Sequence, residues 1–399
     1  MGFSSGSVSF RRFAVVGDAP DAIDQALLDR LSEHALRPGE LGVPEEEEYG
    51  WSGGRHVLDG NFSFENNVYA DALHFALRID SNKVPGDLKK AYTIMEEEAV
   101  AKTNPSGFIS SLQKKDVKET IRSKVDQELR SGRFRRSKLL PILWDLPSQT
   151  VYCNATGKSQ EKLLEIFERT FGLNLLPISS GSLALRLLEP KKRRRDYEDL
   201  RPTRFVQGPD PDGSGQFPEY PWVSKGAEPK DFTGNEFVAW LWHEADHRGS
   251  TIDTSEGEVT IFFDRALDLD CAFGQTGRDT LRGDGVSRMP EALDALRSGK
   301  VPRKAGLLLD CNSMQYSLNL AAETFAFGTL RLPEVEDADN PRVLFEERIG
   351  MLRDFCKVFD ALFDAFLKSR ASSSWEGATG SIRKWIMQSV RSVAVAAVA

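Results

Sequence analysis

Two long segments rich in charged residues place the tightest limit on how this sequence can fold. Residues 86–102 and 108–129 have helical composition with exposed faces rich in lysine and glutamate, and the second has only a weak apolar stripe. A helix with so little apolar surface extends into solvent or contacts a partner, because it has no broad face to bury. We therefore expect two long projecting helices.

The flanking sequence alternates between strand and helix patterns. Leu73, Phe75, Leu77 and Ile79 alternate with His74 and other residues, which predicts a half-buried strand. Further strands are predicted at 9–16, 139–144, 149–153, 173–178, 258–271, 305–310 and 315–320. Helices are predicted at 159–171, 235–247, 290–297 and 344–367. These patterns together predict an α+β fold.

The chain is long enough for more than one core. Its 399 residues are 40% hydrophobic, which fits two or three domains. Residues 190–231 are rich in proline, glycine and charge, with little periodicity, and predict a linker or surface insertion. The predicted regions are 1–189, the linker 190–231, a second α+β region 232–371, and a short helix with a frayed tail at 372–399.

Several classes of protein do not fit the composition. No run of 18 apolar residues is present to span a membrane, and the glycine- and serine-rich start lacks the apolar core of a secretory signal. The four cysteines form no CxxC pair, which is typical of a reducing compartment. We therefore expect a cytoplasmic protein without a membrane partner.

Positive charge is concentrated at three places in a chain whose net charge is -8. They lie at residues 129–138, at 186–195 and between Arg297 and Lys304. Arginine and lysine without neighbouring acids neutralise phosphates at no fixed spacing, although any one cluster is also compatible with a solvated surface. The first cluster joins a long polar helix to a strand, so it is both exposed and held in place.

The segment 243–247 (HEADH) matches the HExxH zinc motif. In that motif two histidines one helical turn apart bind zinc, and the glutamate between them acts as a base. Here His243 and His247 would be the ligands and Glu244 the base. The simpler interpretation is a helix end that Gly249 stops. Because no downstream segment completes a metal site, we predict no catalytic residue, metal or cofactor, and keep a zinc hydrolase as the alternative.

A shorter motif, Gly157-Lys158-Ser159, lacks the upstream glycine of a phosphate loop. Its helix N-terminus is able to bind an anion, but the favoured interpretation is that Ser159 is an ordinary N-cap.

From Tyr49 to Ser179 the order of features resembles the RdgC family of bacterial recombination-associated proteins. The resemblance includes Gly50-Trp51, the strand at 74–79, the charged helices, Arg133-Phe134 and the segment 139–179. A second match covers 288–310. The chain is longer than typical members, through the 190–231 insertion and the tail after Arg370, and its 232–270 block has no clear counterpart.

The resemblance implies mixed antiparallel sheets and a non-enzymatic protein that binds duplex DNA with little sequence preference. It implies a ring-shaped homodimer around DNA, association with the nucleoid, and modulation of RecA-dependent recombination. Phe134 would contribute to the dimer contact. The implied DNA-binding residues are Arg133, Arg135, Arg136, Lys138, Arg288, Lys300, Arg303 and Lys304. A protein-interaction scaffold, with the long helices making only protein contacts, is the further alternative.

Overall fold

The computed structural model describes residues 2–37, 47–105, 107–206, 220–223, 226, 228–247, 249–273, 276–334 and 340–388. The chain forms two compact units, each assembled from separate stretches of sequence. The first consists of Met1–Ala19, Pro147–Asn154 and Leu175–Ala399. The second consists of Pro20–Leu146 and Ala155–Asn174. The predicted boundary after residue 189 thus lies inside the first unit.

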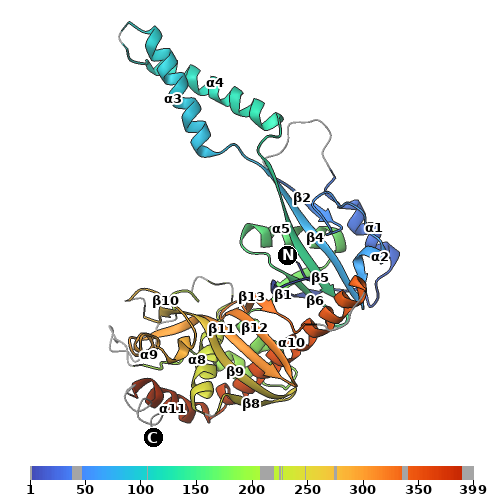
Figure 1. Cartoon of the computed structure of the whole chain (residues 1–399), viewed down its shortest axis with the longest axis vertical. Helices are drawn as coiled ribbons and strands as arrows, with labels where there is room; N and C mark the ends of the chain where they lie inside the picture. The colour runs from blue at the N-terminus through green and yellow to red at the C-terminus, as the bar shows by residue number, and fades with distance from the viewer. Residues whose placement is uncertain are drawn as a thin grey trace. The chain divides into compact units, whose positions relative to one another are not determined.

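The first unit contains a large antiparallel sheet (Figure 1). Its strands follow the order β10-β9-β11-β12-β13-β1-β6, while β7 pairs with β1 and β8 with β9. Neighbouring strands along the order from β10 to β6 are antiparallel. The strands are β1 (Val8–Val16), β6 (Thr150–Cys153), β7 (Asn174–Pro177), β8 (Thr251–Thr254), β9 (Gly257–Cys271), β10 (Asp279–Arg282), β11 (Lys300–Cys311), β12 (Met314–Ala321) and β13 (Ala326–Arg331).

Helices complete the core of the first unit. The long helix α10 places a row of phenylalanines against aromatic side chains of α8 and of the β13 region, such as Phe237 and Phe327. Arg12 of β1 forms a two-pronged ion pair with Asp360 of α10, with N–O distances of 2.9 and 2.7 Å. The helices are α6 (Ser180–Leu188), α7 (Arg194–Asp199), α8 (Phe232–His247), the 3₁₀ helix η1 (Val286–Arg288), α9 (Pro290–Arg297), α10 (Pro341–Arg370) and α11 (Trp375–Met387).

The second unit contains a smaller antiparallel sheet in the order β5-β4-β2, with β3 paired to β4. Trp51 of β2 and Trp144 of β5 pack against Phe171 of α5, and the Trp51 indole donates a hydrogen bond to Thr170 (2.8 Å). Its elements are α1 (Gln25–Glu33), β2 (Glu47–Ser52), α2 (Phe64–Asn67), β3 (Val68–Tyr69), β4 (Ala72–Asn82), α3 (Gly86–Thr103), α4 (Ser111–Arg130), β5 (Arg135–Asp145) and α5 (Lys158–Phe171).

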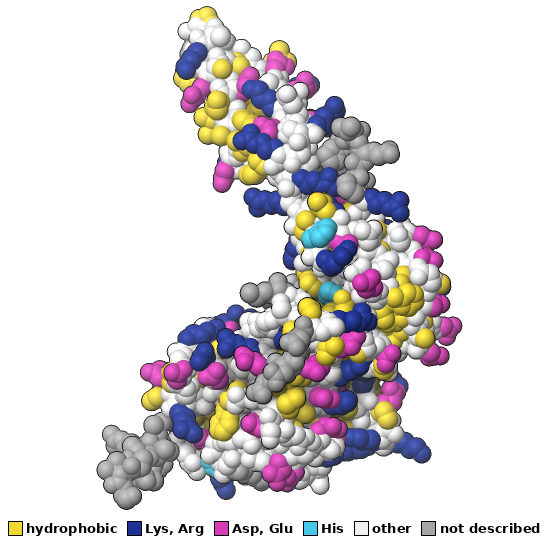
Figure 2. Space-filling view, turned by 45° about the vertical axis from the view of Figure 1, so that its right-hand side comes forward, with side chains coloured by type: hydrophobic (Ala, Val, Ile, Leu, Met, Phe, Trp, Pro, Cys, Tyr) yellow, Lys and Arg dark blue, Asp and Glu magenta, His cyan; other side chains and the backbone are white. Residues whose placement is uncertain are grey.

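Helices α3 and α4 form a hairpin that extends from the ends of β4 and β5 (Figure 1). None of the α3 side chains is buried, and Val117 is the one buried residue of α4. Hydrophobic side chains are visible on the hairpin surface (Figure 2). We call the most exposed apolar side chains of the hairpin the hairpin apolar set: Ile94, Met95, Phe108 and Leu112.

The α+β fold class and the two projecting helices are confirmed. The strand around Leu73 differs from its prediction, because both faces of β4 are buried along most of its length. Its polar face is covered too, since Arg78 and Asp80 neutralise each other there at 2.6 Å. A buried ion pair of this kind removes the need for solvent on that face.

The sequence predicts a linker or a surface insertion at 190–231, and the described part of this segment is not an extended linker. Its described part contains α7, and Tyr197, Leu200, Phe205 and Tyr220 are buried. Aromatic side chains spaced through a polar segment are thus enough to attach it to the first unit. Residues 207–219, 224, 225 and 227, like the predicted frayed tail from 389 onward, lie outside the described residues.

No helix in the described ranges is both long enough and apolar enough to cross a membrane. All four cysteines are buried and free of disulfide bonds.

Candidate nucleic-acid interface

A solvent-open hollow in the second unit collects four basic side chains. Arg136 and Lys138 come from β5, and Lys158 and Lys162 come from α5. Its volume is about 350 Å³, and Glu47 is the one acidic side chain among the described residues that line it. We call this feature the basic hollow. Its lining is completed by Ile79, Ser81, Ser137, Thr156 and Ser159.

Two secondary-structure periods bring these side chains together. Residues two apart on a strand share a face, so Arg136 and Lys138 point to the same side of β5. Residues four apart on a helix are neighbours, so Lys158 and Lys162 lie on one side of α5. Because α5 packs on the sheet to which β5 belongs, the two basic pairs meet at one place.

The charges of the basic hollow are only partly neutralised. The Lys162 Nζ lies 2.7 Å from a carboxylate oxygen of Glu47 and 5.0 Å from the centre of the Tyr49 ring. By contrast, Arg136, Lys138 and Lys158 are exposed, and no carboxylate in the described part of the chain pairs with them. The basic hollow therefore has three cations available for an anionic ligand.

The other two predicted cations of this cluster each lie near a carboxylate. Arg135 faces the side of β5 away from Arg136 and lies 2.9 Å from Asp80 and 3.2 Å from Glu48. Arg133 lies 3.9 Å from Glu128, and its guanidinium is 5.7 Å from the centre of the Phe134 ring. We therefore assign Arg135 a mainly structural role at the base of the hairpin.

The four predicted DNA-binding cations between residues 288 and 304 lie in the first unit, and two of them are neutralised by carboxylates. Lys300 pairs with Asp279 at 2.5 Å, and Arg303 pairs with Glu323 at 2.7 Å while stacking over Trp222. Arg288 and Lys304 are exposed and have no carboxylate partner among the described residues. This cluster thus offers two unpaired cations, whereas the basic hollow offers three.

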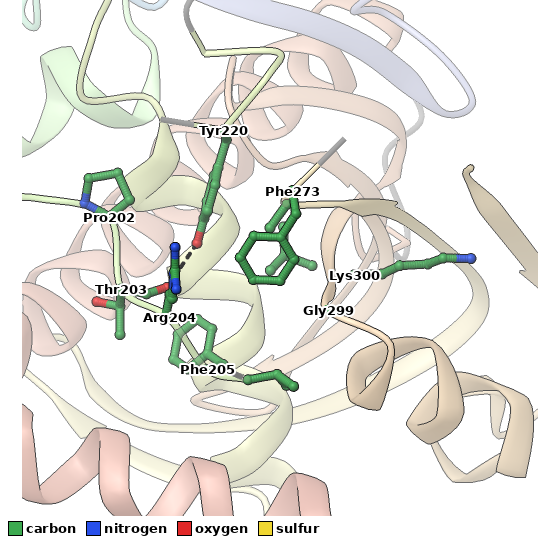
Figure 3. A pocket seen from close by; sticks show the side chains of 11 residues that line it. Pro202, Thr203, Arg204, Phe205, Tyr220, Phe273, Gly299 and Lys300 are labelled. Atoms are coloured by element: carbon green, nitrogen blue, oxygen red, sulfur yellow. Dashed lines mark hydrogen bonds between the residues drawn. The ribbon is translucent and has the colours of Figure 1, made fainter. Parts of the chain in front are cut away.

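Lys300 also borders a cavity of the first unit between residues 202–206 and 299–301 (Figure 3). The cavity has a volume of about 20 Å³, which is room for roughly one water molecule. Tyr220 closes one side by donating a hydrogen bond to the Thr203 carbonyl at 3.2 Å. The Lys300 side chain points away from the cavity (Figure 3). A space this small is unsuited to a nucleotide or a metabolite.

The HEADH segment forms the C-terminal end of α8. His243 Nδ1 lies 3.2 Å from Glu244, and the His243 and His247 rings stack with centres 4.9 Å apart. Asp246 accepts a hydrogen bond from the Trp385 indole at 2.7 Å. Across the described ranges, no group of three or more histidine, cysteine, aspartate or glutamate side chains is placed to hold a metal ion. These contacts support the structural interpretation of HEADH.

Sequence reasoning did not find Lys162 and assigned Ser159 the wrong role. The N-cap of α5 is Gly157, at φ 51°, while Ser159 lies inside the first turn and bonds to Thr156. The available signal was the spacing itself, because lysines four apart on a helix share one side. The spacing of Lys158 and Lys162 indicates a binding site only when the structure places α5 beside Arg136 and Lys138 of β5.

No protein-family model matches this sequence, and a search of curated proteins finds no match to it either.

Proposed function

We propose that this chain is a non-enzymatic protein that binds duplex DNA without sequence preference. One observation carries the proposal: Arg136, Lys138 and Lys158 are exposed, lack acidic partners in the described chain and surround one hollow. Cations grouped in this way neutralise phosphates and release counterions, and this contribution to binding is independent of base sequence. Lysine and arginine side chains also gather around the base of the hairpin (Figure 2).

The proposal extends to a homodimer that encircles DNA and modulates RecA-dependent recombination at the nucleoid, as the resemblance to the RdgC family implies. The hairpin apolar set supports self-association, because Phe108 and Leu112 are 81% and 72% exposed. Exposed apolar side chains on a projecting element provide surface for a protein contact. Phe134, between α4 and β5 at the base of the hairpin, remains the proposed residue of the dimer contact.

The decisive experiment is a fluorescence-anisotropy titration with several unrelated duplexes of equal length across a range of salt concentrations. We expect similar dissociation constants for all duplexes, and a steep loss of affinity as salt rises. A strong preference for one sequence, or binding that is insensitive to salt, would contradict the proposal.

A protein-interaction scaffold is the second candidate, and the hairpin apolar set favours it. A scaffold of this kind would not bind duplex DNA in the same titration, yet would still self-associate or capture a protein partner through the hairpin. The salt-dependent titration therefore separates the two functions.

A further inference from the structure

Glu47 occupies the basic hollow as an internal counter-ion. It is the first residue of β2, and its carboxylate lies 2.7 Å from Lys162. The hydrogen bond from Lys162 lowers the pKa of Glu47, and Lys83 and Lys158 act in the same direction. A carboxylate with a lowered pKa is ionised at neutral pH, so Glu47 carries a full negative charge among the cations.

The neighbouring acid, Glu48, is placed differently. It pairs with Arg135 at 3.2 Å, on the side of β5 away from the basic hollow. Successive side chains of a strand point to opposite faces, which explains why two adjacent glutamates of β2 meet two different basic groups. The chain thus provides an acid inside the basic hollow and a matched acid outside it.

We propose that the basic hollow is a phosphate-binding site, and that the Glu47 carboxylate competes with the phosphate group for Lys162. This inference rests on the proposed function for the source of the phosphate, which is the backbone of a nucleic acid strand. Lys158 and Arg136 contact the phosphate directly, and Lys162 joins them when it leaves Glu47. The negative charge of Glu47 lowers the affinity of the basic hollow for phosphate, so the bound nucleic acid dissociates more readily.

Two physical arguments support this assignment. Basic side chains from a strand and a helix converge on a space of about 350 Å³, which is large enough for a phosphate group with its sugar. A phosphate offers several strong acceptor oxygens, so three or four cations can share one group. The Glu47 carboxylate has only two oxygens, and of the four basic side chains in the hollow it pairs with Lys162.

The test compares Glu47→Gln with Glu48→Gln in duplex binding. Glu47→Gln is expected to tighten binding about fivefold, because it frees Lys162, and to steepen the salt dependence by about one phosphate contact. Glu48→Gln, the matched control, is expected to change affinity less than twofold, since its partner Arg135 keeps Asp80. Equal effects of the two substitutions would overturn the inference.

Lys158→Gln provides an independent test of the phosphate site. It is expected to weaken binding about fivefold and to lower the salt slope by about one. In the double variant Glu47→Gln/Lys158→Gln, most of the gain from Glu47→Gln is expected to disappear. Thermal unfolding of each variant checks that the fold is retained. A loss of affinity without a change of salt slope would count against phosphate contact.

The source of the phosphate is settled by the choice of probe. Duplexes with and without 5′-phosphates bind equally when the backbone supplies the group, whereas a requirement for the 5′-phosphate identifies a strand end. Calorimetry with inorganic phosphate at constant ionic strength tests the site without DNA. Phosphate binding without duplex binding would refute the proposed function alone, and duplex binding unaffected by Glu47→Gln or Lys158→Gln would refute the phosphate site alone.

Discussion

In the first unit, single buried polar residues join segments that are far apart in the sequence. Asp231, 7% exposed, accepts a hydrogen bond at 3.0 Å from the Gly181 N–H at the start of α6. Burial raises the pKa of Asp231 to about 6. An unfolded aspartate titrates near pH 4, so the folded chain holds this proton more tightly than the unfolded chain.

That difference predicts a stability that depends on pH. The contribution of Asp231 is fully present below about pH 4 and is lost as pH rises through about 6, a change of up to about 3 kcal/mol. Asp231→Asn keeps a side-chain oxygen that can accept the hydrogen bond from Gly181 and removes the carboxyl group that titrates. In urea unfolding from pH 4 to 7, the free energy of unfolding of the variant should rise relative to the wild type with pH. Asp354→Asn, on the surface of α10, serves as the control, and a constant difference for Asp231→Asn would contradict the assignment.

At the scale of elements, close backbone approaches decide which helices tolerate a larger side chain. A Cβ at Gly234, in the first turn of α8, would lie 1.8 Å from the Ala322 carbonyl oxygen. At Gly350 of α10 a Cβ meets nothing within 4 Å. The first glycine is therefore required by packing, while the second only weakens its helix.

We predict opposite effects of alanine at these two glycines. Gly234→Ala is expected to lower the free energy of unfolding by about 3 kcal/mol, because the Ala322 backbone must move. Gly350→Ala is expected to raise it by up to about 1 kcal/mol, through helix propensity alone. Chemical denaturation of both variants measures the difference. A stable Gly234→Ala protein would show that α8 shifts more easily than its packing indicates.

The hairpin leads to a prediction about association rather than stability. Leu112→Gln, alone and with Ile94→Gln, removes exposed apolar surface that lies outside either core, so the melting temperature should change little. Self-association should weaken about tenfold for each leucine-sized side chain replaced. Sedimentation equilibrium measures this, with Lys115→Gln on the same helix as the control. An unchanged association constant in the double variant would exclude the hairpin apolar set from the dimer contact.

At the scale of the whole molecule, the position of charge matters more than its sum. The net charge is -8, so any attraction to DNA must come from local groups of cations. Replacing Arg136, Lys138 and Lys158 by glutamine brings the net charge to -11, that is -8 minus 3. Replacing Lys357, Lys368 and Lys384, which are exposed in the first unit, gives the same net charge.

The two triple variants therefore separate local from total charge. The Arg136/Lys138/Lys158 variant is expected to lose at least about thirtyfold in duplex affinity and to lower the salt slope by about three. The control variant should lose less than about threefold. Anisotropy titrations at matched salt compare them. Equal losses would show that total charge, rather than the basic hollow, governs binding.

Local patterns were enough to predict most elements. The alternation around Leu73 gives β4, and the apolar stripe of 159–171, ended by Gly172, gives α5. Helix α6 was not predicted, because its short apolar sequence follows directly on a strand and has no separate periodicity. Among the candidate site residues, Arg136, Lys138, Arg288 and Lys304 are exposed and have no carboxylate partner in the described chain, whereas Arg135, Lys300 and Arg303 are paired with carboxylates.

The sequence by itself determined the fold class, the projecting hairpin and the location of basic clusters, because these depend on neighbours within a few residues. Only the tertiary structure decided which cations are neutralised. The acids that pair with Arg135, Lys300 and Arg303 include Asp80, Asp279 and Glu323, far from them in sequence. Ion pairing depends on distance in space, and packing sets that distance. The same packing brings Lys158 beside Arg136 and so forms the basic hollow.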